Sequence, residues 1–220
     1  FVATHCAWDG EASNFEIIRQ LDENALRSLG NYRLGLAGRH NILNATAALA
    51  SLHLLGFDLA GHEEALASFQ GTERRFEKVY ENAGVTIIND YAHHPTQVRA
   101  TLSAARDAYP NRTLWVVWEP HTFSRTERMR AEFVQALDFA DRVMVSRIYA
   151  AREADDGFTP QVISDELGSK AAYIPDFQQL AKTIAAETTR NDVVLVLSAG
   201  KGPQLSALLA QELESRKECE

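Results

Sequence analysis

The sequence has no long hydrophobic run and very little cysteine. No apolar stretch approaches the ~18 residues that a membrane-spanning helix requires. Cys6 and Cys219 lie near opposite ends of the chain with no metal-ligand spacing around them, which favours reduced thiols over a disulfide scaffold. No secretory leader pattern precedes the first apolar segment. We therefore expect a cytoplasmic protein with no membrane partner.

Basic residues are in the minority. The 22 Lys and Arg residues against 30 Asp and Glu residues give a net charge of −8, which argues against nonspecific binding to nucleic acid or to an anionic membrane. Hydrophobic residues at 45% and charged residues at 24% are typical of an ordinary globular protein. Any anionic ligand would therefore need cations placed locally around it.

A nucleotide-binding phosphate loop is also missing. No segment has the spacing Gly-x-x-x-x-Gly-Lys-Ser/Thr, and the Ser-Ala-Gly-Lys-Gly stretch at 198–202 is only a weak match. The sequence begins with Phe1, inside a β-like pattern, so we expect a fragment of a longer protein.

The two parts of the sequence have different patterns. In residues 1–70, short strands are predicted at 15–19 and 32–36, separated by a helix-compatible stretch at 21–29, and helices follow at 41–55 and 62–69. Gly71 lets the chain reverse before a new pattern begins. We therefore predict two domains, residues 1–70 and residues 71–220.

Strands and helices alternate in residues 71–220. The predicted strands are 76–80, 85–89, 114–118, 143–147, 171–174 and 193–197, and the predicted helices are 95–108, 126–137, 160–167, 177–188 and 205–213. Continuous apolar strands such as 193–197 indicate burial on both faces, as in a parallel sheet covered by helices. The pattern predicts an α/β fold with a doubly wound, Rossmann-like, mostly parallel sheet, preceded by a partial α/β domain.

Ionisable or glycine-rich segments follow four of these strands. They are residues 90–95, 119–125, 148–153 and 198–202. Because ligands of open α/β sheets bind beyond the carboxyl ends of the strands, we expect these segments to form one rim.

The side chains of this rim suit an anionic, oxygen-rich substrate. Imidazoles can exchange protons near neutral pH, and guanidinium groups match carboxylates and phosphates. The candidates are His93, His94, His121, Arg125 and Arg152. A zinc site is the competing interpretation, but the adjacent His93 and His94 cannot easily face one ion, so we predict no metal bound by this chain's own residues.

Three further features suit a nucleotide. Asp90 is the carboxylate that we single out because it directly follows its strand, and it could accept a hydrogen bond from a ribose hydroxyl or a metal-bound water. Asn41 and Asn44 lie three residues apart at a helix start, where both amides can face a purine edge, although capping by Asn41 is an equal alternative. Arg74 and Arg75 are either surface charge or a clamp on a phosphate.

Four segments, in this order along the chain, resemble motifs of the ATP-dependent Mur ligase family. They are residues 38–45, 74–77, 90–95 and 120–126. The doubled histidine before Pro95 and the Pro-His-Thr-Phe-Ser-Arg-Thr segment at 120–126 are most similar to the members that add L-alanine. The resemblance implies a three-domain enzyme, with residues 1–70 the end of the central ATPase domain and 71–220 the C-terminal domain that brings the amino acid.

The resemblance also implies a reaction in peptidoglycan precursor synthesis. The carboxylate of UDP-N-acetylmuramate would be activated with ATP and Mg²⁺ as an acyl phosphate, which the amine of L-alanine attacks. Most ligands of Mg²⁺ and the phosphate cradle would lie in the missing N-terminal and central domains, which are the expected partners of this chain. We therefore expect this chain alone to be inactive and to bind ATP with no measurable affinity, because the triphosphate would remain in water.

The resemblance also implies roles for individual residues of this sequence, at the positions that match the family's motifs. On the nucleotide, Asn41 and Asn44 would contact adenine, Arg75 the phosphates and Asp90 the ribose. Around the amino acid and the acyl phosphate, the expected catalytic residues are His93 and Arg125, and the expected substrate-binding residues are Tyr91, His94, His121 and Arg152.

The sequence departs from the family pattern at three places. Thr122 stands where many relatives have Arg, Glu119 stands where relatives often have Gln, and 198–202 is not the usual ending of the family. Two alternatives remain open. One is the related ligase that recycles murein tripeptide onto the same sugar nucleotide, and the other is a non-catalytic nucleotide- or anion-binding module.

Overall fold

The computed structural model describes residues 1–22, 25–59, 61–82, 84–155 and 157–217. The chain divides into two compact units. Unit 1 contains Phe1–Gly71 with Ser103–Pro110, and unit 2 contains Thr72–Leu102 with Asn111–Glu220. The chain passes from one unit to the other beside the boundary predicted from Gly71.

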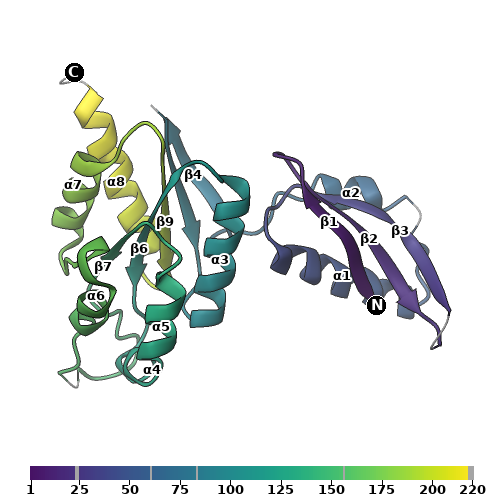
Figure 1. Ribbon diagram of the computed structural model, residues 1–220, viewed down its shortest axis with the longest axis horizontal. Helices are drawn as coiled ribbons and strands as arrows, with labels where there is room; N and C mark the ends of the chain where they lie inside the picture. The colour runs from purple at the N-terminus through teal and green to yellow at the C-terminus, as the bar shows by residue number, and fades with distance from the viewer. Residues whose placement is uncertain (23–24, 60, 83, 156, 218–220) are drawn as a thin grey trace. The chain divides into compact units, whose positions relative to one another are not determined.

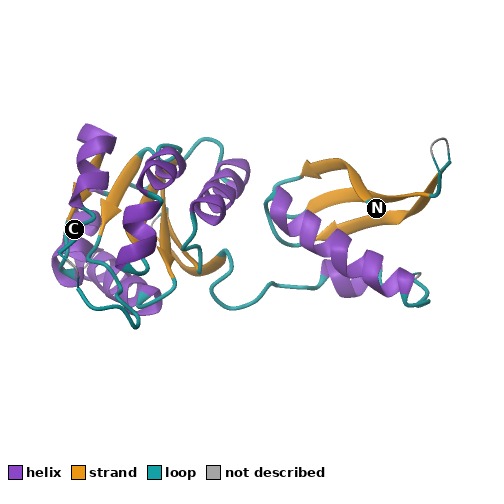
Figure 2. Ribbon diagram, turned by 90° about the horizontal axis from the view of Figure 1, so that it is seen from below, coloured by secondary structure: helices purple, strands orange, loops and turns teal. Residues whose placement is uncertain are grey.

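Unit 1 is a three-stranded antiparallel sheet covered on one face by two helices (Figure 2). Its elements are β1 (Val2–Trp8), β2 (Ser13–Gln20), β3 (Leu26–Leu34), α1 (Arg39–Leu54) and α2 (Glu63–Ala67). The central strand β2 alternates, so Phe15 and Ile17 face inward and pack against Ile42 and Leu49 of α1. This alternation creates the core of unit 1.

Part of the helix-compatible stretch at 21–29 belongs to strand β3, so that part of the prediction is wrong. β2 and β3 pair antiparallel from Ser13 opposite Leu34 to Gln20 opposite Leu26, and residues 23–24 lie outside the described residues. Although Leu21, Ala25 and Leu29 recur at helical spacing, cross-strand pairing of residues 26–28 with β2 decides their conformation.

Unit 2 contains a six-stranded sheet in the order β4-β5-β9-β6-β7-β8 (Figure 1). Its strands are β4 (Glu77–Asn82), β5 (Val85–Asp90), β6 (Thr113–Glu119), β7 (Arg142–Val145), β8 (Ala171–Tyr173) and β9 (Asp192–Ser198). β5, β9, β6, β7 and β8 are parallel, and only the edge strand β4 runs antiparallel, along β5. The predicted mostly parallel α/β fold is confirmed.

Helices cover both faces of this sheet (Figure 1). They are α3 (Pro95–Ala108), α4 (Phe123–Arg128), α5 (Arg130–Leu137), α6 (Gln161–Leu167), α7 (Phe177–Glu187) and α8 (Gly202–Lys217), with one 3-10 turn, η1 (Gly168–Lys170). The chain steps in one direction from β5 to β6, β7 and β8 and then returns to β9, so right-handed connections place α7 on the other face from α3 and α5. α7 and α8 share a core with alternate residues of β5, β6 and β9.

Two boundaries in unit 2 differ from the sequence prediction. The helix predicted at 126–137 begins earlier, at Phe123, and is broken into α4 and α5 at Met129, whose φ of −108° and ψ of 26° are not helical. The helix predicted at 205–213 is longer at both ends and forms α8 from Gly202 to Lys217, with Leu213 buried in the core. Among the described residues, no helix is long and apolar enough to cross a membrane.

Candidate functional site

The carboxyl ends of four parallel strands lie next to one another in unit 2. β5, β9, β6 and β7 are adjacent in that order. Register pairs join Asp90 to Leu197, Leu197 to Trp118 and Trp118 to Val145, so these four residues lie at the same level of the sheet. The four segments that follow these strands therefore share one edge of the sheet, as expected for parallel strands.

A row of four half-buried rings crosses this edge. The ring centroids of Tyr91 and His93 are 5.2 Å apart, those of His93 and His121 5.4 Å, and those of His121 and Tyr149 5.7 Å. We call these four residues the rim row. The structure thus brings together three residues predicted from sequence and adds Tyr149, which the sequence analysis placed only within the segment 148–153.

Three guanidinium groups lie against the rim row. Nη1 of Arg125 is 3.1 Å from Nδ1 of His121. The guanidinium carbons of Arg74 and Arg75 lie 4.7 Å and 5.4 Å from the ring centroid of Tyr91, which is cation–π distance. The rim is therefore locally cationic within an acidic chain, which suits an anionic ligand.

His93 is oriented by the backbone that precedes it. Its Nδ1 lies 2.8 Å from the carbonyl oxygen of Tyr91, and its backbone N–H donates to Oε1 of Gln97 at 3.1 Å. A carbonyl only accepts, so Nδ1 carries the hydrogen and Nε2 of the neutral ring is left with its lone pair. His93 can therefore accept a proton at Nε2.

His121 is held in the neutral form. Burial lowers the pKa of the imidazole below its usual 6.5, and the nearby His93 and Arg125 lower it further. Neutral His121 can accept at Nδ1 from the Arg125 guanidinium, which fixes one donor of that side chain.

We expect an NMR titration to place the midpoint of His121 below 6.5. Between that midpoint and 6.5 the unfolded chain binds more protons than the folded one, so folding stability is full above this window and falls as the pH drops through it. Arg125→Gln removes one repelling charge and should raise the midpoint, whereas a midpoint above 6.5 in the unsubstituted protein would contradict this assignment. Loss of one signal in His121→Gln assigns the resonance.

The start of α4 is fixed by the segment that follows β7. Thr122 has a positive φ of 69°, and its N–H donates to the carbonyl of Tyr149 at 2.9 Å. The carboxylate of Glu153 accepts from the N–H and the hydroxyl of Ser124, and these hydrogen bonds hold the pKa of Glu153 below its usual value. These contacts position the turn that carries His121 and Arg125.

Two predicted substrate-binding residues lie outside the rim row. Nδ1 of His94 accepts from the N–H of Thr96 at 3.3 Å, so its ring lies over the first turn of α3. Arg152 is exposed and makes no hydrogen bond or ion pair with the residues that the structure describes. Their roles in binding substrate stay predictions.

A second carboxylate lies at a strand end, at Glu119, which the sequence marked only as a departure from the family pattern. Glu119 is the last residue of β6, as Asp90 is of β5, and its side chain is only 2% exposed. Glu119 accepts from the hydroxyl of Ser198, its register partner on β9, and from the N–H of Lys201 at 2.7 Å. Because it directly follows the apolar run of its strand, the same signal that singled out Asp90 could have found it.

Three backbone amides of the glycine-rich segment 198–202 already have hydrogen-bond partners within the protein. The N–H groups of Gly200 and Gly202 donate to the hydroxyl of Ser198 at 3.0 Å and 2.9 Å, and that of Lys201 donates to Glu119. A phosphate loop requires backbone N–H groups that point at the ligand. The weak match to such a loop is therefore not supported.

The predicted nucleotide-binding residues have different surroundings. In α1 of unit 1, the Asn41 amide donates to the carbonyl of Ala37 at 2.8 Å, and Asn44 is exposed. No side chain caps α1, so Asn41 is not its N-cap. Arg75 is exposed beside Tyr91, and the buried carboxylate of Asp90 accepts from the N–H groups of Phe76 and Ala92 at 2.9 Å and 2.8 Å. Asn44 and Arg75 are thus accessible to a ligand, while Asp90 already anchors the backbone.

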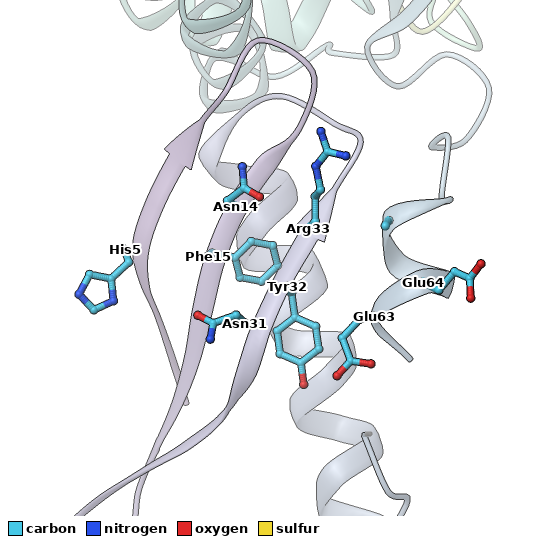
Figure 3. Close-up of a pocket in the computed structure, with 9 residues that line it drawn as sticks. His5, Asn14, Phe15, Asn31, Tyr32, Arg33, Glu63 and Glu64 are labelled. Carbon is cyan, nitrogen blue, oxygen red and sulfur yellow. The ribbon is translucent and has the colours of Figure 1, made fainter. Parts of the chain in front are cut away.

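Two of the cavities formed by described residues lie in unit 1, and none of the predicted site residues lines these two. One, of about 490 Å³, is lined by residues of the sheet and α2, among them Phe15, Tyr32, Arg33 and Glu63 (Figure 3). The Arg33 guanidinium in this lining already forms ion pairs, because its Nη2 lies 3.5 Å from Oδ2 of Asp9 and 3.3 Å from Oε2 of Glu11. The other, of about 420 Å³, is lined by residues around His53 and Phe57.

The described residues contain no group of three or more His, Cys, Asp or Glu side chains that could hold a metal ion. The described residues by themselves therefore do not form a complete Mg²⁺ site, and we derive no step through a metal here.

Comparison with known proteins assigns the family. Residues 74–200, more than half of the chain, match the family described as "Mur ligase, glutamate ligase domain". The chain belongs to the Mur ligase family. The predicted resemblance is thereby confirmed.

Two curated relatives of this Mur ligase chain carry the same name. It is 39% identical over 176 residues to the UDP-N-acetylmuramate--L-alanine ligase of Caldanaerobacter subterraneus subsp. tengcongensis, covering 78% of this chain and 38% of that protein. It is 38% identical over 223 residues to the enzyme of the same name from Roseiflexus sp., covering 98% of this chain and 47% of that protein. The chain thus spans less than half the length of these curated relatives.

Solved structures agree with the fold. The UDP-N-acetylmuramate-alanine ligase of Thermotoga maritima matches with a TM-score of 0.79 and 27% identity, over 97% of this chain and 46% of that one. A murein peptide ligase from Psychrobacter arcticus matches with a TM-score of 0.64 and 22% identity, over 96% of this chain and 43% of that one, and shows the fold alone.

Proposed function

We propose that this chain is the C-terminal part of an ATP-dependent ligase that joins L-alanine to UDP-N-acetylmuramate in peptidoglycan precursor synthesis. The names of the curated relatives and of the Thermotoga structure support the reaction. The observation that carries the proposal is the cationic rim row, because it places an acceptor for a proton and donors for a carboxylate on one edge of the sheet.

Arg125 binds the carboxylate of the incoming amino acid. Its guanidinium is planar and can hold a carboxylate through two parallel hydrogen bonds, while Nη1 is steadied by the neutral His121. Fixing the carboxylate sets the direction of the amine. Positioning two reactants in this way supplies a large part of the rate of a ligase.

His93 accepts the proton that the ammonium group of the amino acid must lose before it attacks. Its Nε2 is available because Nδ1 donates to the carbonyl of Tyr91. Tyr91 and His121 stand on either side of His93 in the rim row and restrict the orientation of the ring. We place His94 and Arg152 farther out, where they contact the substrate.

The nucleotide is held partly by this chain. ATP supplies the phosphoryl group that converts the muramoyl carboxylate into an acyl phosphate. Asn44 with Asn41 contacts the adenine, Arg75 contacts the phosphates, and Asp90 lies beside the ribose. Because the described residues provide neither a phosphate cradle nor a set of metal ligands, we expect both to come from the longer protein.

Unit 1 is proposed to be the end of a larger ATP-binding domain, with unit 2 the amino-acid-binding domain. Most of the large hydrophobic side chains exposed in the described chain belong to unit 1: Phe1, Val2, Leu21, Leu26, Leu43, Leu54, Leu55, Phe57 and Phe69. Exposed apolar surface of this extent is typical of a contact site. The remainder of the domain is the partner we expect to cover it.

The full-length protein tests this proposal in an assay of phosphate release. We expect release from ATP to require both UDP-N-acetylmuramate and L-alanine. Faster release with murein tripeptide in place of L-alanine would instead identify the recycling ligase. No amine-dependent release with either donor would leave a non-catalytic binding module. Calorimetric titration of the 220-residue chain with ATP should show no measurable binding, and micromolar affinity would contradict our division of the nucleotide site.

A further inference from the structure

The segment 198–202 lies between two oppositely charged side chains, and the proposed reaction uses neither of them. Glu119 accepts from the Ser198 hydroxyl and from the N–H of Lys201, and Arg74 donates to the carbonyl groups of Ser198 and Gly200. Glu119 and Ser198 are also register partners at the ends of adjacent parallel strands. Two departures from the family pattern, Glu119 and the 198–202 segment, are therefore in direct contact.

Glu119 ties this segment to β6. Its Oε2 accepts from the hydroxyl of Ser198 and from the N–H of Lys201 at 2.7 Å, and the Ser198 hydroxyl accepts in turn from Gly200 and Gly202. Glu119 and Ser198 are 2% and 1% exposed. Buried hydrogen bonds to a charged group are strong, so the conformation of the segment is closely fixed.

Arg74 holds the same segment from its other side. Its Nη2 donates to the carbonyl of Ser198 at 2.7 Å and lies 3.4 Å from the carbonyl of Gly200. The same guanidinium stacks on Tyr91, the first ring of the rim row. Arg74 has a positive φ of 59°, and its backbone N–H donates to Glu77, which fixes its unusual backbone. The side chain thus couples the 198–202 segment to the rim row.

Gly200 is pressed against the last ring of the rim row. A Cβ atom on Gly200 would lie 2.5 Å from Cγ of Tyr149 and 2.7 Å from Oε2 of Glu119, so no side chain fits there. The backbone of Tyr149 donates to the carbonyl of Pro120 at 2.8 Å and accepts from the N–H of Thr122. These bonds hold the turn that carries His121. Contact is therefore continuous from Glu119 through Gly200 and Tyr149 to His121.

We propose that Glu119 and Arg74 are positioning residues for the amino-acid site. They fix the 198–202 segment as a rigid support for Tyr149, and Tyr149 in turn sets the position of the His121 ring and of the Arg125 guanidinium that contacts it. The effect on catalysis rests on the proposed function of the rim, whereas the effect on the His121 ring does not.

Three substitutions in the full-length protein test this inference. Glu119→Ala removes the acceptor of Ser198 and Lys201, Gly200→Ala pushes on Tyr149, and Arg74→Lys keeps the charge but loses the planar donor. In each we expect the His121 NMR titration midpoint to shift toward 6.5, because the ring becomes more exposed. We also expect kcat/KM for the amino acid to fall about 10-fold to 100-fold, as for a misplaced reactant, with KM for ATP changed less than about twofold.

Two controls separate positioning from a general loss of structure. Glu119→Gln keeps an acceptor oxygen and should restore the His121 midpoint and kcat/KM to within about twofold of the unsubstituted values. Lys201→Ala should have no effect, because the side chain is exposed and only its backbone N–H contacts Glu119. An unchanged His121 titration midpoint in both Gly200→Ala and Arg74→Lys would overturn the inference. These two variants decide the question even if Glu119→Ala fails to fold. Loss of activity without any shift of His121 would overturn it too. If the unsubstituted protein lacks alanine-dependent turnover, the proposed function fails, and the titration still decides the positioning.

Discussion

Replacing Arg125 with alanine in the full-length protein is expected to raise the Michaelis constant for the amino acid about 100-fold or more, with less than about a threefold change for ATP. A guanidinium that holds a carboxylate makes two charge-assisted hydrogen bonds of about 1.5–3 kcal/mol each, and every 1.4 kcal/mol is about tenfold in affinity. The half-buried guanidinium beside His121 is placed for this contact. Steady-state kinetics with each substrate varied in turn measures both constants.

Arg128 is the matched control for this prediction. It lies three residues farther along α4 and is exposed, so Arg128→Ala changes the net charge by the same amount outside the rim row. We expect its constants to stay within about twofold of the unsubstituted values. An Arg125→Ala variant with equal effects on both substrates, or with the larger effect on ATP, would count against the role of Arg125.

Trp118→Ala is expected to reduce the free energy of unfolding by about 3–5 kcal/mol, as for other buried tryptophans replaced by alanine. Trp118 lies on β6, is fully buried, and packs against Phe133 of α5 with ring centroids 4.6 Å apart. Its removal leaves a cavity between the sheet and α5, directly before Glu119. Urea denaturation followed by circular dichroism measures the loss.

Trp118→Phe provides the contrast. The indole N–H of Trp118 is buried without a hydrogen-bond partner among the described residues, and an unpaired buried donor costs about 1–3 kcal/mol. Phenylalanine removes this donor and keeps most of the apolar volume, so we expect less than about half the loss of the alanine variant. Equal losses in the two variants would mean that packing against Phe133 does not carry the effect.

The sheet of unit 2 was predictable because its strands are continuously apolar. Runs such as 193–197 suit only a strand that is buried on both faces, and the alternation with helices leaves a parallel order as the simple solution. In unit 1 the strands predicted at 15–19 and 32–36 overlap β2 and β3, but the first half of β3 was not predictable because its residues are also compatible with a helix. Strand β3 exists because β2 pairs with it and because Tyr32 and Leu34 reach the core.

The clustering of three candidate residues was predictable from the sequence. The placement of His93, His121 and Arg125 after parallel strands was enough to expect them on one edge, and the structure brings them together. The contact of Tyr149 with this cluster was not predictable, because a lone tyrosine in a loop carries no signal of its own. Glu119 was identified only as a departure from the family pattern, although it follows its strand as directly as Asp90 does.

By itself the sequence determined the α/β class, the family and the edge of the sheet on which the chemistry-bearing residues gather, since all three follow from local patterns and short motifs. Only the tertiary structure decided which of those residues touch and which carry structural hydrogen bonds. The hydroxyl of Ser198 meets Glu119 across 79 positions of the chain, and Arg74 meets the carbonyl of Ser198 across 124. Such contacts depend on which strands are neighbours in the sheet, and no local pattern of residues encodes that arrangement.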